Sequence, residues 1–205
     1  MKNAEQLDLR RQQIFESAMM CFIDKGFHQT SMRDIASLAQ VSLGNLYNHF
    51  RSKEALIAEI ANAEMQDLLP LFEALDTTTP RAALLRFAQD YLQLCRQEHY
   101  VKLSCEIIAE CARNPAIAKL FAANREQICA QLSSKINDGL RAQEIATDLP
   151  VDHIAHTLLE LIEAWAFRHN LWQQTHFKHS AARQKSDAQC LLLTIEKLLL
   201  PFPQV

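Results

Sequence analysis

The stretch "SMRDIASLAQVSLGNLYNHF", residues 31–50, contains two short helical patterns with a pause of about three residues between them. Ser31 can cap the first helix, and Asp34 three residues later forms a variant capping box with a negative charge at the positive helix end. Ser42 can cap the second helix in the same way. Two short helices joined by a tight turn predict a helix-turn-helix.

The second pattern, residues 42–49, lacks the Lys and Glu side chains of an ordinary solvent-facing helix. It carries short hydrogen-bonding groups instead: Ser42, Asn45, Asn48 and His49. In a helix-turn-helix the second helix enters the major groove of DNA, where phosphates and base edges accept hydrogen bonds from small polar groups. The composition favours that contact, with a polar surface helix as the alternative.

Helical patterns continue on both sides of this stretch. Apolar residues recur at helical spacing over about residues 5–25, and Gly26 follows where a helix end favours a left-handed residue. A further helix is predicted from Ser52, and the rest of the chain reads as long helices over about 80–97, 101–112, 115–142, 151–173 and 184–200. Gly and Pro are scarce, at 3 and 6 residues, so few turn signals for a sheet exist.

These patterns predict an all-α protein. We expect an N-terminal three-helix helix-turn-helix domain over residues 1–53, which binds DNA. Residues 54–205 are expected to form a second, larger helical domain.

The charge of the chain is unevenly distributed. The net charge of −3 does not by itself suggest a nucleic-acid partner. Residues 1–53 hold seven Lys and Arg against five Asp and Glu, a balance of +2, whereas residues 54–205 have a balance of −5. The positive sign at the N-terminal end allows a nucleic-acid contact there.

Apolar runs such as "CLLLTI" at residues 190–195 are too short to span a membrane, and the N-terminus lacks the apolar core of a signal peptide. We therefore expect a soluble cytoplasmic protein without a membrane partner. None of the six cysteines forms a CxxC pair, so we interpret them as small buried hydrophobic residues. Redox sensing by Cys105 with Cys111 is the alternative.

The segment "GFHQTSMRDIASLAQVSLGNLYNHFRSKEALI", residues 26–57, resembles the DNA-binding segment of TetR-family transcriptional regulators. The matching features, in order and without gaps, are Gly26-Phe27, Thr30-Ser31, Asp34-Ile35-Ala36, Val41-Ser42, Gly44, Leu46-Tyr47, His49-Phe50, and Ser52-Lys53-Glu54 with Leu56. The resemblance covers about the first sixty residues. It implies a DNA-binding regulator with a helical ligand-binding and dimerisation body.

The resemblance also implies which residues contact DNA. They are Thr30, Ser31, Arg33, Ser42, Leu43, Gly44, Asn45, Tyr47, His49 and Lys53. Gly44 would let the backbone approach the groove closely, and Tyr47 and Lys53 would contact phosphates. Four apolar residues of the same segment are expected in the core instead: Ile35, Val41, Leu46 and Phe50.

The chain departs from the family pattern at Gln40, where the family usually has Gly in the turn between the two helices. If the backbone stays left-handed, a non-Gly residue there costs on the order of 1 kcal/mol. We expect the turn to be kept with mild strain.

Two helices near the C-terminus have wide apolar surfaces, which favours burial against both a core and a partner subunit, with a buried helix of a monomer as the alternative. The candidate dimer-interface residues are Leu158, Leu159, Ile162, Ala166, Leu191, Leu192, Ile195, Leu198 and Leu199. A homodimer with two-fold symmetry would present two recognition helices to half-sites about 34–36 Å apart.

An effector pocket is harder to locate from the sequence. Candidate ligand-binding residues are the aromatic and acidic side chains of the body: Phe87, Tyr91, Tyr100, Glu106, Glu110, Phe121, Glu163 and Trp165. An apolar pocket with a buried carboxylate favours a lipophilic cation, whereas a solvated acidic face is the alternative. The pairs His153 with His156 and His176 with His179 lack further ligands at a metal-site spacing, so no metal or cofactor is expected.

Taken together, these features predict a ligand-responsive repressor that binds a palindromic operator as a homodimer and is released by a small-molecule effector. The sequence contains no GxSxG, P-loop, GxGxxG after a strand or HExxH, so an enzyme is not expected. A helical protein–protein adaptor and a transcriptional activator on the same fold are the alternatives.

Overall fold

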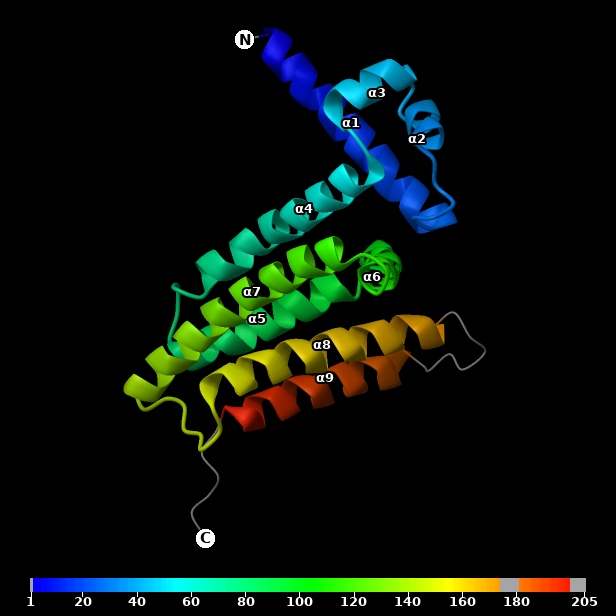
Figure 1. Cartoon of the computed structure of the whole chain (residues 1–205). Coiled ribbons are helices and arrows are strands. Elements are labelled where there is room, and N and C mark those ends of the chain that lie inside the picture. Colours follow the sequence, from blue (N-terminus) through cyan, green and yellow to red (C-terminus); the bar gives the residue numbers. More distant parts are fainter. Residues whose placement is uncertain (1, 174–180, 200–205) are drawn as a thin grey trace. The chain divides into compact units, whose positions relative to one another are not determined.

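The computed structural model describes residues 2–173 and 181–199, and every regular element in these residues is a helix (Figure 1). The helices are α1 (Lys2–Lys25), α2 (Met32–Leu38), α3 (Leu43–His49), α4 (Lys53–Ala74), α5 (Pro80–Cys95), α6 (Glu98–Cys111), α7 (Pro115–Arg141), α8 (Val151–Gln173) and α9 (Ala181–Leu198). The predicted all-α class is confirmed. No helix among these residues is long and apolar enough to cross a membrane.

The chain forms two compact units. The first unit comprises the residues up to Gln66 together with Lys102–Ala123, and the second comprises Asp67–Val101 with the residues from Asn124 onward. Helices α4, α6 and α7 therefore each contribute residues to both units. The two units are defined by contacts within the chain. The predicted boundary between residues 53 and 54 separates two functions instead, and it stays a prediction.

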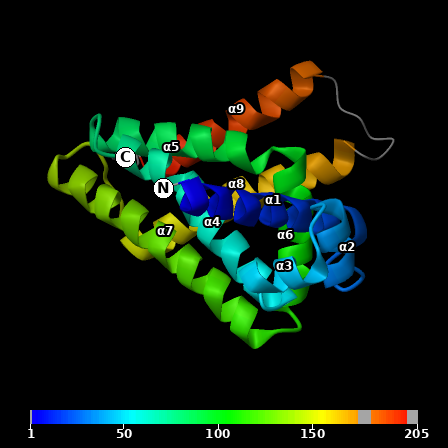
Figure 2. The same ribbon diagram turned by 90° about the horizontal axis from the view of Figure 1, so that it is seen from above.

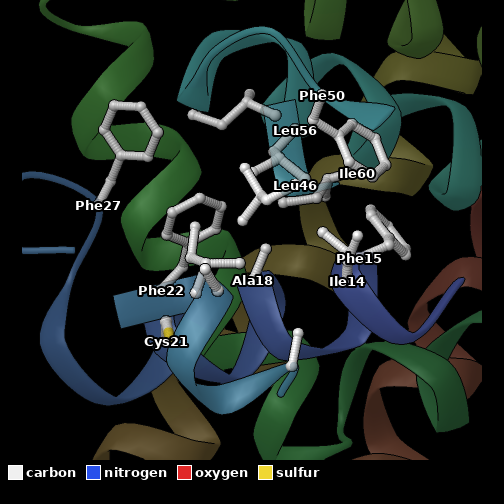
Figure 3. Packing of buried hydrophobic residues seen from close by; sticks show 14 of the residues in the cluster. Ile14, Phe15, Ala18, Cys21, Phe22, Phe27, Leu46, Phe50, Leu56 and Ile60 are labelled. Carbon is white, nitrogen blue, oxygen red and sulfur yellow. The ribbon is translucent and has the colours of Figure 1, made fainter. Parts of the chain in front are cut away.

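The core of the first unit is built on one face of α1. Ile14, Ala18 and Phe22 recur at helical spacing and are almost fully buried. Leu46 of α3 and Leu56 of α4 belong to the same hydrophobic cluster, which Figure 3 shows. Burial of each large side chain contributes about 1.5–3 kcal/mol. The cluster therefore supplies the stability that the seven-residue helices α2 and α3 lack by themselves.

The expected helix caps are confirmed at both short helices. Ser31 is the N-cap of α2: its hydroxyl accepts from the Asp34 N–H at 3.1 Å, and Asp34 Oδ2 accepts from the Ser31 N–H at 2.8 Å. The hydrogen bond from the Lys25 ammonium, at 2.8 Å, and those from Ser31 hold the pKa of Asp34 well below its usual range. Ser42 is the N-cap of α3 and accepts from the Asn45 N–H at 3.1 Å.

The turn between α2 and α3 keeps the left-handed backbone expected for it. Gln40 has a φ of 53°, although it is not glycine. The Val41 N–H donates to the Ala36 carbonyl at 3.0 Å and closes the turn. Figure 1 and Figure 2 both place α2 beside α3, in agreement with the packing of these helices.

In the second unit α5 packs against α8 and α9, and α8 packs against α9. Seven of the nine candidate dimer-interface residues lie in this core: Leu158, Leu159, Ile162, Ala166, Leu191, Ile195 and Leu199 are all at most 8% exposed. Leu192 and Leu198 are half-buried, and Leu193, which was not among the candidates, is 50% exposed. A role of the seven buried residues in a subunit interface stays a prediction, and their observed contacts are within the chain.

Replacement of Gln40 by glycine tests the strain in the turn. Gln40→Gly should raise the free energy of unfolding by about 1 kcal/mol, because glycine adopts the left-handed backbone without a Cβ penalty. Urea denaturation followed by circular dichroism measures this change. Gln40→Ala is the matched control and should change stability by less than about 0.5 kcal/mol, since alanine meets the same penalty. A gain for alanine as large as that for glycine would contradict a backbone origin.

Candidate nucleic-acid interface

Helices α2 and α3 present polar side chains that have no partner inside the protein. Arg33 of α2 is exposed, and Tyr47 of α3 is 46% exposed. Neither side chain makes a hydrogen bond or an ion pair with another of the described residues. An arginine and a phenol held on adjacent helices with free donors are suited to bind phosphate oxygens.

Gly44, in the first turn of α3, has no structural reason to be glycine. A Cβ built on it meets nothing within 4 Å, and its φ is not positive. Glycine in a helix costs roughly 0.5–1 kcal/mol relative to alanine. None of the described residues requires this cost, and the α3 backbone at Gly44 is open to close approach from outside.

Other residues predicted to contact DNA are engaged inside the protein. Thr30 is 1% exposed, and the carbonyl oxygens of Cys21 and Gly26, at 3.0 and 2.8 Å from its hydroxyl oxygen, share its single O–H donor. In this conformation Thr30 has no exposed group that could bind a phosphate. Its hydroxyl instead stabilises the turn after α1. The Ser31 N–H and hydroxyl both donate to Asp34.

The remaining candidates lie at the surface or beside the core. Ser42 is exposed, whereas Asn45 and His49 are half-buried, and Leu43 packs against the hydrophobic cluster. Lys53 is half-buried, and its ammonium donates to the Phe27 carbonyl at 2.7 Å.

Three of the four residues of this segment that were predicted to lie in the core are buried. Ile35 and Leu46 are fully buried, and Phe50 is 2% exposed. Val41 is half-buried and packs against the same cluster. The apolar residues of the segment therefore orient α3, and Ser42, Tyr47 and Asn48 lie exposed on its outer face.

Two residues of α1, which were not predicted, fix the ends of both short helices. The Arg11 guanidinium donates to the His49 carbonyl at 3.1 Å, pairs with Glu59 at 2.8 Å and lies 4.3 Å from the centre of the Phe50 ring. Gln13 donates its side-chain N–H to the Ala39 carbonyl at 3.0 Å. Arg11 thus satisfies the C-terminus of α3, and Gln13 satisfies the C-terminus of α2.

The sequence does hold a signal for Arg11. It precedes Ile14 by three residues and Phe15 by four, so it continues the buried face of α1. A charged residue on an otherwise apolar helix face predicts a specific partner, but the spacing does not identify His49 or Glu59.

A second polar cluster lies inside the second unit. The Tyr91 hydroxyl of α5 donates to Glu163 Oε1 of α8 at 2.8 Å, and Arg125 of α7 donates to Glu163 Oε2 at 2.6 Å. Tyr91 is 2% exposed, and this burial raises the pKa of its hydroxyl well above the usual value. Burial opposes the charge of Arg125, but Glu163 outweighs it and raises the pKa of the guanidinium. Phe87 stacks on Tyr91 with ring centres 5.5 Å apart.

The candidate ligand residues are divided between the two units. Phe87, Tyr91 and Glu163 form the cluster just described, and Tyr100 lies close enough to raise the pKa of Tyr91. Trp165 also belongs to the second unit and stacks on His169 with ring centres 4.6 Å apart.

Glu106, Glu110 and Phe121 belong to the first unit instead. The expected cationic effector depended on an apolar pocket with a buried carboxylate. Arg125, which was not predicted, pairs with Glu163.

The described residues contain no group of three or more potential metal ligands. His156 Nδ1 lies 3.3 Å from the Cys129 sulfur, whereas His153 is exposed. His176 and His179 lie outside the described residues. Burial raises the pKa of both Cys105 and Cys111, which opposes the thiolate on which redox sensing depends.

Comparisons with known proteins agree with this geometry. The family model "Bacterial regulatory proteins, tetR family" matches residues 14–60, which include α2 and α3. The solved structure of Salmonella enterica GusR has 30% sequence identity and a TM-score of 0.74, over 93% of this chain and 95% of that one. This chain belongs to the TetR family.

Other TetR-family relatives extend the comparison. The transcriptional regulator UidR of Escherichia coli K12 is 28% identical over 153 residues, which are 74% of this chain and 76% of UidR. The structure of Bacillus subtilis FadR in complex with stearoyl-CoA is 18% identical with a TM-score of 0.74, over 94% of this chain and 99% of that one, a likeness in fold. As a TetR-family member, this chain is a DNA-binding transcriptional regulator and not an enzyme.

Arg11 and its neighbour Arg10 provide a matched test of the helix cap. Arg11→Ala should lower the free energy of unfolding by about 2 kcal/mol, because it removes a charge-assisted hydrogen bond and a cation–π contact. Arg10→Ala should change it by less than about 0.5 kcal/mol, since Arg10 makes an exposed hydrogen bond to Gln13. Urea denaturation of both variants measures the difference. Equal losses would mean that charge, not the cap, is responsible.

Proposed function

We propose that this TetR-family regulator is a repressor that binds a palindromic operator as a homodimer and leaves it when a small-molecule effector binds. The main support for this proposal is Gly44, a glycine in a helix where an added Cβ would meet only open space. A backbone left bare at the outer face of α3 fits a helix that approaches base edges closely.

The proposed contacts follow the family resemblance, and exposure and internal bonding rank them. Ser42, Leu43, Gly44 and Asn45 face the bases, whereas Ser31, Arg33, Tyr47, His49 and Lys53 contact the DNA backbone. Arg33 and Tyr47 are the strongest of these assignments, because their polar groups have no internal partner among the described residues. Thr30 is left out because it is buried. DNA binding is assigned to residues 1–53, and effector binding and dimerisation to residues 54–205.

A homodimer follows from the geometry of duplex DNA. One seven-residue recognition helix reads only a few base pairs, so two copies on half-sites about 34–36 Å apart are needed for selectivity. Exposed Leu193 on α9 is an apolar residue available to a partner subunit. Occupation of an operator by such a dimer blocks other proteins from the same duplex, which is the simplest route to repression.

The effector is proposed to bind in the second unit at the cluster of Tyr91, Arg125 and Glu163, beside the ring of Phe87. FadR, which shares the fold, is known in complex with stearoyl-CoA, so a body of this kind can hold a small molecule. The mutual pairing of Arg125 and Glu163 favours an effector whose polar group exchanges hydrogen bonds with both. The effector must bind the DNA-incompetent state more tightly to release the operator.

Gly44→Ala separates DNA binding from folding, because its two expected effects have opposite signs. It should raise the free energy of unfolding by up to about 1 kcal/mol, since alanine is the better helix former. It should weaken operator binding by about tenfold or more, since the new methyl group holds the backbone away from the bases. Fluorescence anisotropy on a duplex that the wild-type protein selects from a random-sequence pool measures the second effect.

Ser134→Ala is the control for this comparison. Ser134 is exposed on α7, so the substitution also improves helix propensity but lies outside the proposed interface. Its operator affinity should stay within about twofold of wild type. Unchanged affinity of Gly44→Ala would contradict the proposed approach of α3 to the bases, and selection of no duplex by the wild-type protein would contradict operator binding altogether.

Tyr91→Phe tests the effector site with the loss of one oxygen atom. Its stability should fall by about 1 kcal/mol because Glu163 loses a buried donor. Operator affinity without effector should stay unchanged, whereas the effector concentration for half-release should shift by about fivefold or more. A thermal-shift screen of small molecules identifies the effector first. An unchanged release concentration would place the effector elsewhere.

A further inference from the structure

The turn between α1 and α2 is held by a helix from a distant part of the sequence. The Phe27 N–H donates to Glu106 Oε2 of α6 at 3.0 Å. A Cβ built on Gly26 would lie 3.0 Å from the same oxygen, and Gly26 has a φ of +79°. Glycine is therefore needed there both for the backbone angle and for the approach of the carboxylate. Glu106 belongs to the same compact unit as α1, α2 and α3.

A second carboxylate of α6 is directed at the same turn. Glu110 lies one helical turn after Glu106, on the same face, and its side chain is 7% exposed. Its Oε2 is 3.3 Å from Nε2 of His28, but it accepts no hydrogen bond from any described residue. Burial of a carboxylate beside one exposed partner is costly, and apolar replacements of buried ion pairs are often as stable. The hydrogen bond from Phe27 accounts for Glu106, but stability alone gives no reason for a second acidic residue here.

Lys53 holds the other side of the same peptide group. Its ammonium donates to the Phe27 carbonyl at 2.7 Å and lies 4.4 Å from the centre of the Phe27 ring. The N–H of Phe27 is thus bound by α6 and its carbonyl by α4. Since Lys53 is a proposed phosphate contact, a shift of the Phe27 backbone would move a DNA-binding group.

Charge and position make opposite predictions for these carboxylates. Two negative charges in the unit that meets DNA repel its phosphates, so their removal should strengthen binding if charge alone matters. If the carboxylates fix the turn, their removal should weaken binding. The sign of the change in affinity therefore separates the two roles.

We propose that Glu106 and Glu110 are positioning residues for operator binding, which fix the Gly26–His28 turn and, through Phe27, the ammonium of Lys53. The inference depends on the proposed function of this unit. Both residues lie outside the matched family segment, residues 14–60, so the determinants of DNA affinity extend to α6.

The test measures the affinity of full-length variants for the duplex selected by the wild-type protein, at several salt concentrations. Glu106→Ala should weaken binding about tenfold and reduce the salt slope by about one, the value for one lost phosphate contact. Glu106→Gln keeps an oxygen that accepts the Phe27 N–H, so it should bind within about threefold of wild type. Glu16→Gln removes an exposed charge of α1 from the same unit and should bind as wild type or slightly more tightly.

A double-mutant cycle with Lys53 tests whether Glu106 acts on DNA affinity through the position of the Lys53 ammonium. In a Lys53→Ala background, Glu106→Ala should cause less than about a twofold further loss, because the group it positions is already absent. Full additivity of the two losses would overturn the route through Lys53.

Hydrogen exchange at the Phe27 amide shows whether the turn has opened in a folded protein. Lost protection with binding as tight as wild type, or tighter, would overturn the proposal. If Glu106→Ala does not fold, Glu110→Ala carries the test: weaker binding supports positioning, and unchanged or tighter binding contradicts it. Failure of the wild-type protein to select any duplex would instead refute the proposed function.

Discussion

Helices of seven residues are too short to be stable in water by themselves, and both α2 and α3 have this length. Their geometry depends on α1, whose buried face supplies the core and whose Arg11 and Gln13 satisfy the carbonyls at the ends of the two helices. This support is sufficient to keep the left-handed turn at Gln40 without glycine. The geometry of the proposed DNA-binding surface therefore depends on α1 as much as on α2 and α3 themselves.

The polar residues of the interface are distinguished by their internal bonds. Thr30 and Ser31 use their hydroxyl groups inside the unit, whereas the Arg33 guanidinium and the Tyr47 hydroxyl have no partner among the described residues. Gly44, which lies between these two residues in the sequence, leaves the α3 backbone uncovered by a side chain. A family resemblance transfers roles by position, but only the hydrogen bonds show which side chains are available to a partner.

Acidic residues with similar sequence context acquire different roles in the two units. Glu106 and Glu110 were expected at an effector pocket; in the structure Glu106 accepts from the Phe27 N–H in the turn after α1, and Glu110 lies beside His28 of the same turn. Glu163, expected at the same pocket, accepts from Tyr91 and is neutralised by Arg125. The position of a carboxylate on a helix does not say whether it contacts solvent or another group. The group that it contacts decides whether it stabilises the fold, binds a ligand or repels DNA.

The sequence by itself determined the all-α class, the helix-turn-helix pattern and its caps at Ser31 and Ser42, because these depend on residues a few positions apart. The left-handed turn was expected from the family resemblance. It did not reveal that Arg11 reaches His49, that Arg125 reaches Glu163, or that Glu106 reaches Phe27, pairs separated by 38, 38 and 79 positions. Helical periodicity gives the face on which a residue lies, but not which helix packs against that face. Only tertiary packing brings such groups within hydrogen-bond distance, so it alone decided which polar residues hold the fold and which remain for DNA.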